Sequence, residues 1–271
     1  KDNAEDVEAQ SVKESLFGEK VNGYSVGVKH DQVANTQNRS QVKLSQTTRK
    51  ALKTMQDTPH RRNNDLTMLA TLMGESLKTM LGYVETDPEG NQALYKSQKG
   101  KNISIDNALS DAMEVVDAIG SNNAEVYYSV GATRVGRHQY QGINPQNNKI
   151  LRALVSPTWA TINLKDEDEV AAFWIGVAQA SDIYKIEKRN QQELTEADVN
   201  AEFMKEYGTA VEMVESFLET GSLEGDLAEA MGKVEMQQLA AVFAVAQYNQ
   251  AKKKGQSSFE TSLSVELDGL T

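Results

Sequence analysis

The 271-residue sequence predicts a mainly helical α+β protein with a small antiparallel β element. Three observations support this fold class. The sequence has only 4 prolines and many residues that favour helices. Long stretches place apolar residues at helical spacing. Short runs of β-branched and aromatic residues occur near residues 126–143 and again near residue 265. No period of 20–50 residues recurs, so a repeat protein is not expected.

The first half of the sequence is expected to be largely helical. Residues 1–31 are polar without a helical stripe and are expected to be a linker or edge segment. Residues 32–64 are basic, with Asp57 as the one acidic residue. They form either a track that binds a nucleic-acid backbone or a solvated basic loop and helix. Helices are expected over 65–81 and 104–119, with an exposed loop over 91–102.

The second half is expected to alternate between short strands and long helices. Strands over 125–130 and 139–143 would form a hairpin around Gly131 and Gly136. A capping box from Thr195 to Asp198 indicates a helix start. The remaining expected elements are a short helix over 146–155, a strand over 159–164, helices within 169–248, and a last strand over 259–268.

The charge distribution is uneven. The formal net charge is -11, from 39 acidic and 28 basic residues. Residues 126–164 nevertheless contain no aspartate or glutamate, and they include four basic residues, Arg134, Arg137, Lys149 and Arg152. A local basic surface on an acidic protein indicates a site for a phosphate-rich ligand. A buried strand and hairpin would also exclude carboxylates, although buried strands tend to exclude arginine as well.

Several classes of site are excluded by composition. The absence of cysteine excludes disulfides and cysteine-based metal sites. The three histidines, His30, His60 and His138, do not have metal-ligand spacing. No apolar run approaches the ~20 residues needed to span a membrane, and no signal peptide is visible, so no membrane partner is expected. The sequence begins with Lys1 rather than methionine, so we expect it to be a piece of a longer protein.

Two motifs resemble those of the single-subunit DNA-dependent RNA polymerases of podoviruses and mitochondria. Thr133-Arg134-Val135-Gly136-Arg137, followed by Asn144-Pro145-Gln146, is similar to the Thr/Asp-x-x-Gly-Arg signature. Residues 263–269, LSVELDG, resemble polymerase motif A, a palm strand that ends in Asp-Gly. The two motifs stand in the family's order. Three further strings resemble the virion-packaged RNA polymerases of the Schitoviridae, at 33–37, 173–183 and 220–223.

The resemblance covers roughly residues 30–271 and implies the first part of a right-hand polymerase. Residues 32–125 would be a helical, thumb-like region. Residues 126–271 would be a partial palm that ends at motif A, with a helical insertion over 165–255.

The resemblance also assigns roles to residues. Asp268 and the carbonyl of Gly269 would hold Mg²⁺, or Mn²⁺, for two-metal nucleotidyl transfer. Arg137 would contact the template or the RNA–DNA hybrid beside the catalytic centre; Arg134 stands at a variable position, and Thr133 would cap the turn. Lys149 and Arg152 would either extend this track or lie on a solvated helix face. Without the resemblance, a strand-ending Asp-Gly is usually a turn, and Arg137 could simply brace the hairpin.

The function implied is DNA-templated RNA synthesis by a phage virion-packaged polymerase. Its partners would be a DNA template, nascent RNA and ribonucleoside triphosphates, and it would act in the host cytoplasm after ejection from the virion. The later family motifs are absent from the 271 residues, so we expect another polymerase segment or a second chain to complete the site, and this chain alone to be inactive. Two alternatives remain: a subunit of a split two-chain polymerase, and a non-catalytic virion structural protein.

Overall fold

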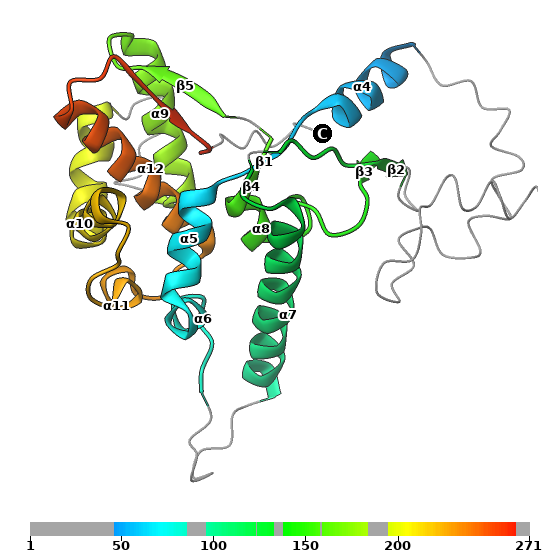
Figure 1. Cartoon of the computed structure of the whole chain (residues 1–271), viewed down its shortest axis with the longest axis horizontal. Helices are drawn as coiled ribbons and strands as arrows, with labels where there is room; N and C mark the ends of the chain where they lie inside the picture. The colour runs from blue at the N-terminus through cyan, green and yellow to red at the C-terminus, as the bar shows by residue number, and fades with distance from the viewer. Residues whose placement is uncertain are drawn as a thin grey trace, which may run out of the picture. The chain divides into compact units, whose positions relative to one another are not determined.

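The computed structural model describes most of the chain, and in it helices predominate. The described residues are 46–85, 96–122, 124–132, 138–157, 159–183 and 195–263. The chain divides into two compact units, residues 1–58 with 127–146, and residues 59–126 with 147–271. Figure 1 shows the elements of each, coloured along the chain. The described strands form three two-stranded antiparallel pairs, so the predicted α+β class is confirmed.

The first unit contains one helix and the predicted hairpin. Helix α4 is Gln46–Asp57, and strands β2 (Val130–Ala132) and β3 (His138–Tyr140) pair antiparallel. The hairpin is confirmed, but the predicted first strand over 125–130 is wrong in its position. Val126 and His60 both belong to the second unit. They pair with each other through backbone hydrogen bonds of 2.8 and 2.9 Å.

The second unit begins with β1 (Arg61–Arg62), α5 (Asn64–Met73), α6 (Glu75–Met80) and α7 (Lys96–Ile119). The single helix predicted over 65–81 is divided at Gly74, whose φ of 53° lies in the region that favours glycine. The loop predicted over 91–102 is wrong from Lys96 onward, where α7 begins. Its polar first turns are held by Asn102, whose buried side chain bonds both the N–H and the carbonyl of Val84.

The later helices form the main core of the second unit. They are α8 (Lys149–Leu154), α9 (Glu167–Ala180), α10 (Glu196–Thr220), α11 (Leu227–Met231) and α12 (Met236–Lys253). The capping box predicted at Thr195 and Asp198 is present at the start of α10. Helix α12 packs against α8, α9 and α10, and the largest fully buried side chains of these helices include Trp174, Phe203 and Phe243.

Two short strand pairs complete the second unit. Strand β4 (Val155–Ser156) pairs with β1, and β5 (Ala160–Asn163) pairs with β6 (Ser258–Thr261). Phe259 of β6 joins an aromatic cluster with Phe173 and Tyr248, at ring-centroid distances of 5.3 and 5.9 Å. This cluster fixes β6 on α9 and α12. The last strand predicted over 259–268 is thus present in its first part, and residues 264–268 lie outside the described residues.

Candidate nucleic-acid interface

The residues predicted to act in catalysis lie next to elements that the structure describes. Thr133, Arg134 and Arg137 fall between β2 and β3, and Asp268 and Gly269 follow β6; all five lie outside the described residues. The structure therefore shows what holds each motif at its edges. Lys149 and Arg152 are described and lie on α8.

The Asn-Pro-Gln motif fastens the hairpin that carries the arginine motif. The side chain of Asn144, which is 1% exposed, donates to the carbonyls of Tyr140 and Gly142 at 3.0 and 2.9 Å. Its Oδ1 accepts from the backbone N–H of Gln146, and the side chain of Gln146 accepts from the backbone N–H of Tyr140. The motif therefore closes the chain onto the end of β3. In the sequence these residues served only as a family signature.

Tyrosine side chains join the hairpin to α4 within the first unit. The rings of Tyr128 and Tyr140 lie 5.5 Å apart, and the Tyr140 hydroxyl donates to the carbonyl of Met55 at 3.2 Å. Burial raises the pKa of Tyr128 to about 12 and also raises the pKa of Tyr140 above its ordinary value. Both phenols are therefore neutral near pH 7, and no phenolate charge opposes an anion at this hairpin.

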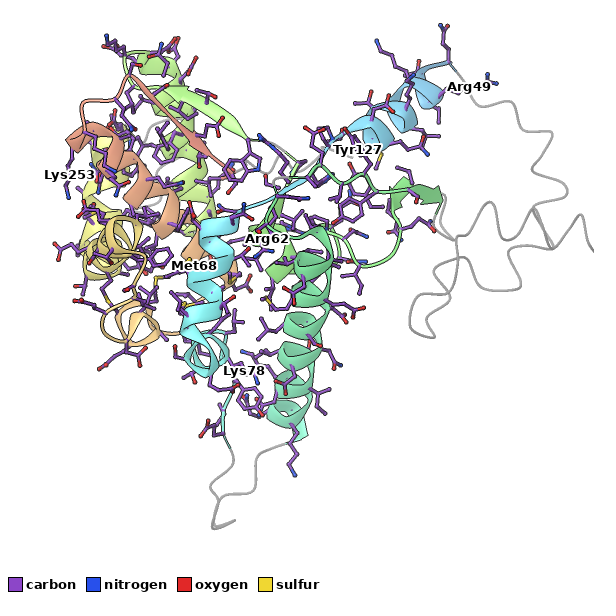
Figure 2. All side chains as sticks on the ribbon, viewed as in Figure 1. Arg49, Arg62, Met68, Lys78, Tyr127 and Lys253 are labelled. Atoms are coloured by element: carbon purple, nitrogen blue, oxygen red, sulfur yellow. The ribbon has the colours of Figure 1, made fainter. Side chains whose placement is uncertain are left out.

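Helix α4 presents basic side chains to solvent. Arg49, Lys50 and Lys53 are exposed, and Figure 2 shows Arg49 pointing away from the helix. Lys53 forms an ion pair with Asp57 at 3.9 Å, with side chains 79% and 63% exposed. Such a pair is weak and exchanges readily with a phosphate. The structure thus shows a helix in the basic segment 32–64, and whether it binds a backbone stays a prediction.

Lys149 and Arg152 occupy the outer face of α8. Asn148 caps the helix, accepting from the N–H groups of Ile150 and Leu151. Lys149 forms an ion pair with Glu235 at 2.9 Å, with the two side chains 65% and 57% exposed, and Arg152 is half-buried. An exposed pair of this kind contributes about 0–1 kcal/mol to stability. The geometry is compatible with both predicted readings, an extended track and a solvated face.

Removal of the Asn144 side chain should loosen the hairpin. Asn144→Ala leaves the carbonyls of Tyr140 and Gly142 without that donor, and we expect a loss of about 1–3 kcal/mol in the free energy of unfolding. Hydrogen exchange should quicken at the backbone N–H of Tyr140. The exposed Asn122 provides a matched control, since Asn122→Ala removes only a local bond to the N–H of Ala124. Equal exchange rates at Tyr140 in the wild type and in Asn144→Ala would contradict this role.

The described residues contain neither a metal cluster nor a membrane span. Within the six described stretches, no group of three or more histidine, aspartate or glutamate side chains is placed to hold a metal ion. In the same stretches, no helix combines the length and the hydropathy needed to cross a bilayer.

Comparison with known proteins supports the resemblance seen in the motifs. Residues 47–155, from α4 through the hairpin to the start of β4, match the model of a virion DNA-directed RNA polymerase domain. Residues 169–249, from α9 to α12, match the model of the plug insertion of the virion DNA-directed RNA polymerase. Over both stretches the chain is similar to the phage virion RNA polymerases. Its relative in Enterobacteria phage N4, the virion DNA-directed RNA polymerase, is 28% identical over 187 residues.

The match to the phage N4 polymerase covers only a small part of that protein. It covers 65% of this chain and 5% of that protein. The resemblance inferred from the motifs is therefore confirmed at the level of the virion RNA polymerase family. The roles of Thr133, Arg134, Arg137, Lys149, Arg152, Asp268 and Gly269 stay predictions.

Proposed function

We propose that this chain contributes part of the catalytic centre of a DNA-directed RNA polymerase, which joins ribonucleotides on a phage DNA template. The observation that carries the proposal is the pair of family matches, because the first spans the hairpin with the Thr-x-x-Gly-Arg motif. In this proposal residues 32–125 are the thumb-like region, and residues 126–271 are the partial palm with an insertion over 165–255. The match to a plug insertion within 165–255 supports that division.

The strand that precedes the proposed metal ligands in the sequence is well anchored. Strand β6 is paired with β5 and anchored through Phe259, so it provides a rigid base for the segment that leads to Asp268. The carboxylate of Asp268 and the carbonyl of Gly269 are hard oxygen donors, which fit Mg²⁺ or Mn²⁺. A bound Mg²⁺ would supply Lewis-acid stabilisation of the charge on the attacking and leaving oxygens.

The arginines of the hairpin are proposed to position the nucleic acid. A guanidinium presents donors in a planar fork that matches the oxygens of a phosphate. Arg137 then binds the template or hybrid backbone near the growing end, and Thr133 closes the turn. The hairpin ends are fixed by Asn144 and by Tyr140, so the loop that carries Arg137 starts from rigid supports. Positioning of this kind is a main source of catalysis in phosphoryl transfer.

The partners and location follow from the same proposal. They are a DNA template, nascent RNA and ribonucleoside triphosphates, with the polymerase packaged in the virion and active in the host cytoplasm. The phage N4 relative is far longer than this chain, and we propose that a further polymerase segment, or a second chain, supplies the other metal-binding carboxylate. The 271-residue chain alone should therefore not extend RNA.

A template-dependent extension assay tests the proposal. The complete polymerase should extend an RNA primer on single-stranded phage DNA, and chelation of divalent cations should stop extension until Mg²⁺ or Mn²⁺ is restored. The isolated chain should give no extension under the same conditions. Absence of template-dependent synthesis by the complete protein would contradict the proposed function and would favour a structural role in the virion.

A further inference from the structure

Arg61 lies over the ring of Trp159 in the second unit. The guanidinium carbon is 5.2 Å from the ring centroid, within the range of a cation–π interaction. The two residues are 98 positions apart in the sequence and are brought together because β1 pairs with β4, with Arg61 opposite Ser156. Both side chains are half-buried. The ring holds the guanidinium in place, and a held guanidinium loses less conformational freedom when it binds an anion.

Arg61 forms no ion pair in the described part of the chain, although Glu125 lies next to Val126, the antiparallel bridge partner of His60. No ion pair or side-chain hydrogen bond joins Arg61 to any described residue. Its guanidinium contacts the ring of Trp159. The segments that carry the pair, 58–64 and 147–165, contain no aspartate or glutamate. One carboxylate of the adjoining strand, Glu260, lies opposite Thr161 and forms no ion pair with Arg61. A partly exposed guanidinium that forms no ion pair can bind a phosphate from solution.

The neighbouring arginine shows what a structural role looks like at this position. Arg62, labelled in Figure 2, donates from Nη1 to the carbonyl of Val116 at 3.1 Å. That carbonyl belongs to the last turn of α7, where a positive charge is favourable. Successive residues of a strand point to opposite faces. Arg62 therefore caps the C-terminal end of α7. Arg61 lies on the other face of β1 and forms no such hydrogen bond with a described helix end.

The pair lies beside the strand that leads to the proposed metal ligand. Trp159 precedes Ala160, which pairs with Thr261 of β6. Asn63, two residues after Arg61, donates to the hydroxyl of Ser262 at 2.8 Å. Asp268 is seven positions after Thr261, and a segment of that length spans at most about 25 Å. Both Arg61 and Trp159 are therefore tied to the end of β6.

We infer that Arg61 and Trp159 form a contact site for the phosphodiester backbone of single-stranded DNA. Arg61 binds the phosphate, and Trp159 keeps the guanidinium in position. Single-strand sites combine such cations with aromatic side chains. The inference rests on the proposed function in one respect: it takes the bound strand to be the template.

Binding of a labelled oligonucleotide tests this site. The probe is fluorescein-labelled oligo-dT of about 12 nucleotides, within the range that single-strand sites occupy, titrated with the 271-residue chain at several salt concentrations. Arg61→Ala should weaken binding about fivefold to tenfold at low salt and reduce the slope of log affinity against log salt by about 0.7, the value for one lost phosphate contact on a single strand.

Two control variants separate the site from charge and from folding. Lys165→Ala removes one exposed charge just beyond the other end of β5, and its affinity and salt slope should equal those of the wild type. Arg61→Lys keeps the charge and loses the planar fork, so it should bind more weakly than the wild type with most of the salt slope retained. If Arg61→Ala lowers the melting temperature, the affinity and salt slope of Arg61→Lys decide the test instead.

Tryptophan fluorescence gives a second readout. The chain has 2 tryptophans, and Trp174 is 1% exposed in the core. Binding of unlabelled oligo-dT should change the emission of the wild type, and the change should disappear in Trp159→Phe. A change that persists in Trp159→Phe, no binding by the wild type at low salt, or equal affinities and slopes for Arg61→Ala and Lys165→Ala would overturn the inference. If these results occur while the complete polymerase extends RNA, the proposed function stands without this site.

Discussion

Asp268→Asn should reduce nucleotide addition by the complete polymerase about a thousandfold or more. The substitution keeps the size and hydrogen bonding of the side chain but removes the charge that a hard cation requires. Template affinity should be nearly unchanged, because basic side chains supply it. Extension should be measured across Mg²⁺ and Mn²⁺ concentrations, next to a binding titration at fixed salt.

Glu260→Gln is a matched control for Asp268→Asn. Glu260 is an exposed carboxylate on β6, opposite Thr161. Removal of its charge tests whether the loss of any negative charge near this strand reduces extension. Extension by Glu260→Gln should resemble that of the wild type. Near-normal extension by Asp268→Asn in Mg²⁺ would mean that Asp268 is an ordinary turn residue and that residues 263–269 are not motif A.

Arg137→Ala should lower the extension rate of the complete polymerase about a hundredfold, which is the usual cost of a reacting end misplaced by about 1 Å. The melting temperature should change little, because an arginine that contacts the nucleic acid rather than the fold contributes little to stability. The extension of a single nucleotide and the melting temperature should therefore be measured on the same preparation.

Arg134→Ala is the comparison for Arg137→Ala within the same loop. Arg134 stands at the variable position of the motif, so its loss should have a smaller effect on extension. The opposite pattern for Arg137→Ala, with a normal extension rate and a large fall in melting temperature, would show that Arg137 braces the hairpin and does not touch the nucleic acid.

Most of the helices were predicted correctly because capping residues and apolar spacing are signals within a single helix. The capping box of Thr195 and Asp198 marked the start of α10, and the apolar spacing marked α12. Where prediction was wrong, a long-range contact decided the structure. Asn102 binds Val84 and supports the polar start of α7. Val126 pairs with His60 and so does not belong to the hairpin strand.

The candidate site was predictable only in part for the same reason. The motif at residues 133–137 is a contiguous string, so the sequence revealed it directly. The contact between Arg61 and Trp159 depends on pairing between β1 and β4, two strands of two residues each. Strands of that length have no periodicity to read. The one available signal was the basic character of residues 32–64, which a solvated helix explains equally well.

The separation of residues 137 and 268 tests the central claim most directly, because a shared catalytic centre requires the two motifs to meet. The chain has no cysteine, so cysteines introduced at Arg137 and Asp268 carry spin labels at those two positions alone. Pulsed electron paramagnetic resonance then gives the distance between them. We predict one narrow distribution that corresponds to a Cα separation within ~20 Å, about the length of one strand, once the linkers of the labels are allowed for. A distribution centred well beyond that distance would contradict the assignment of both motifs to a polymerase palm.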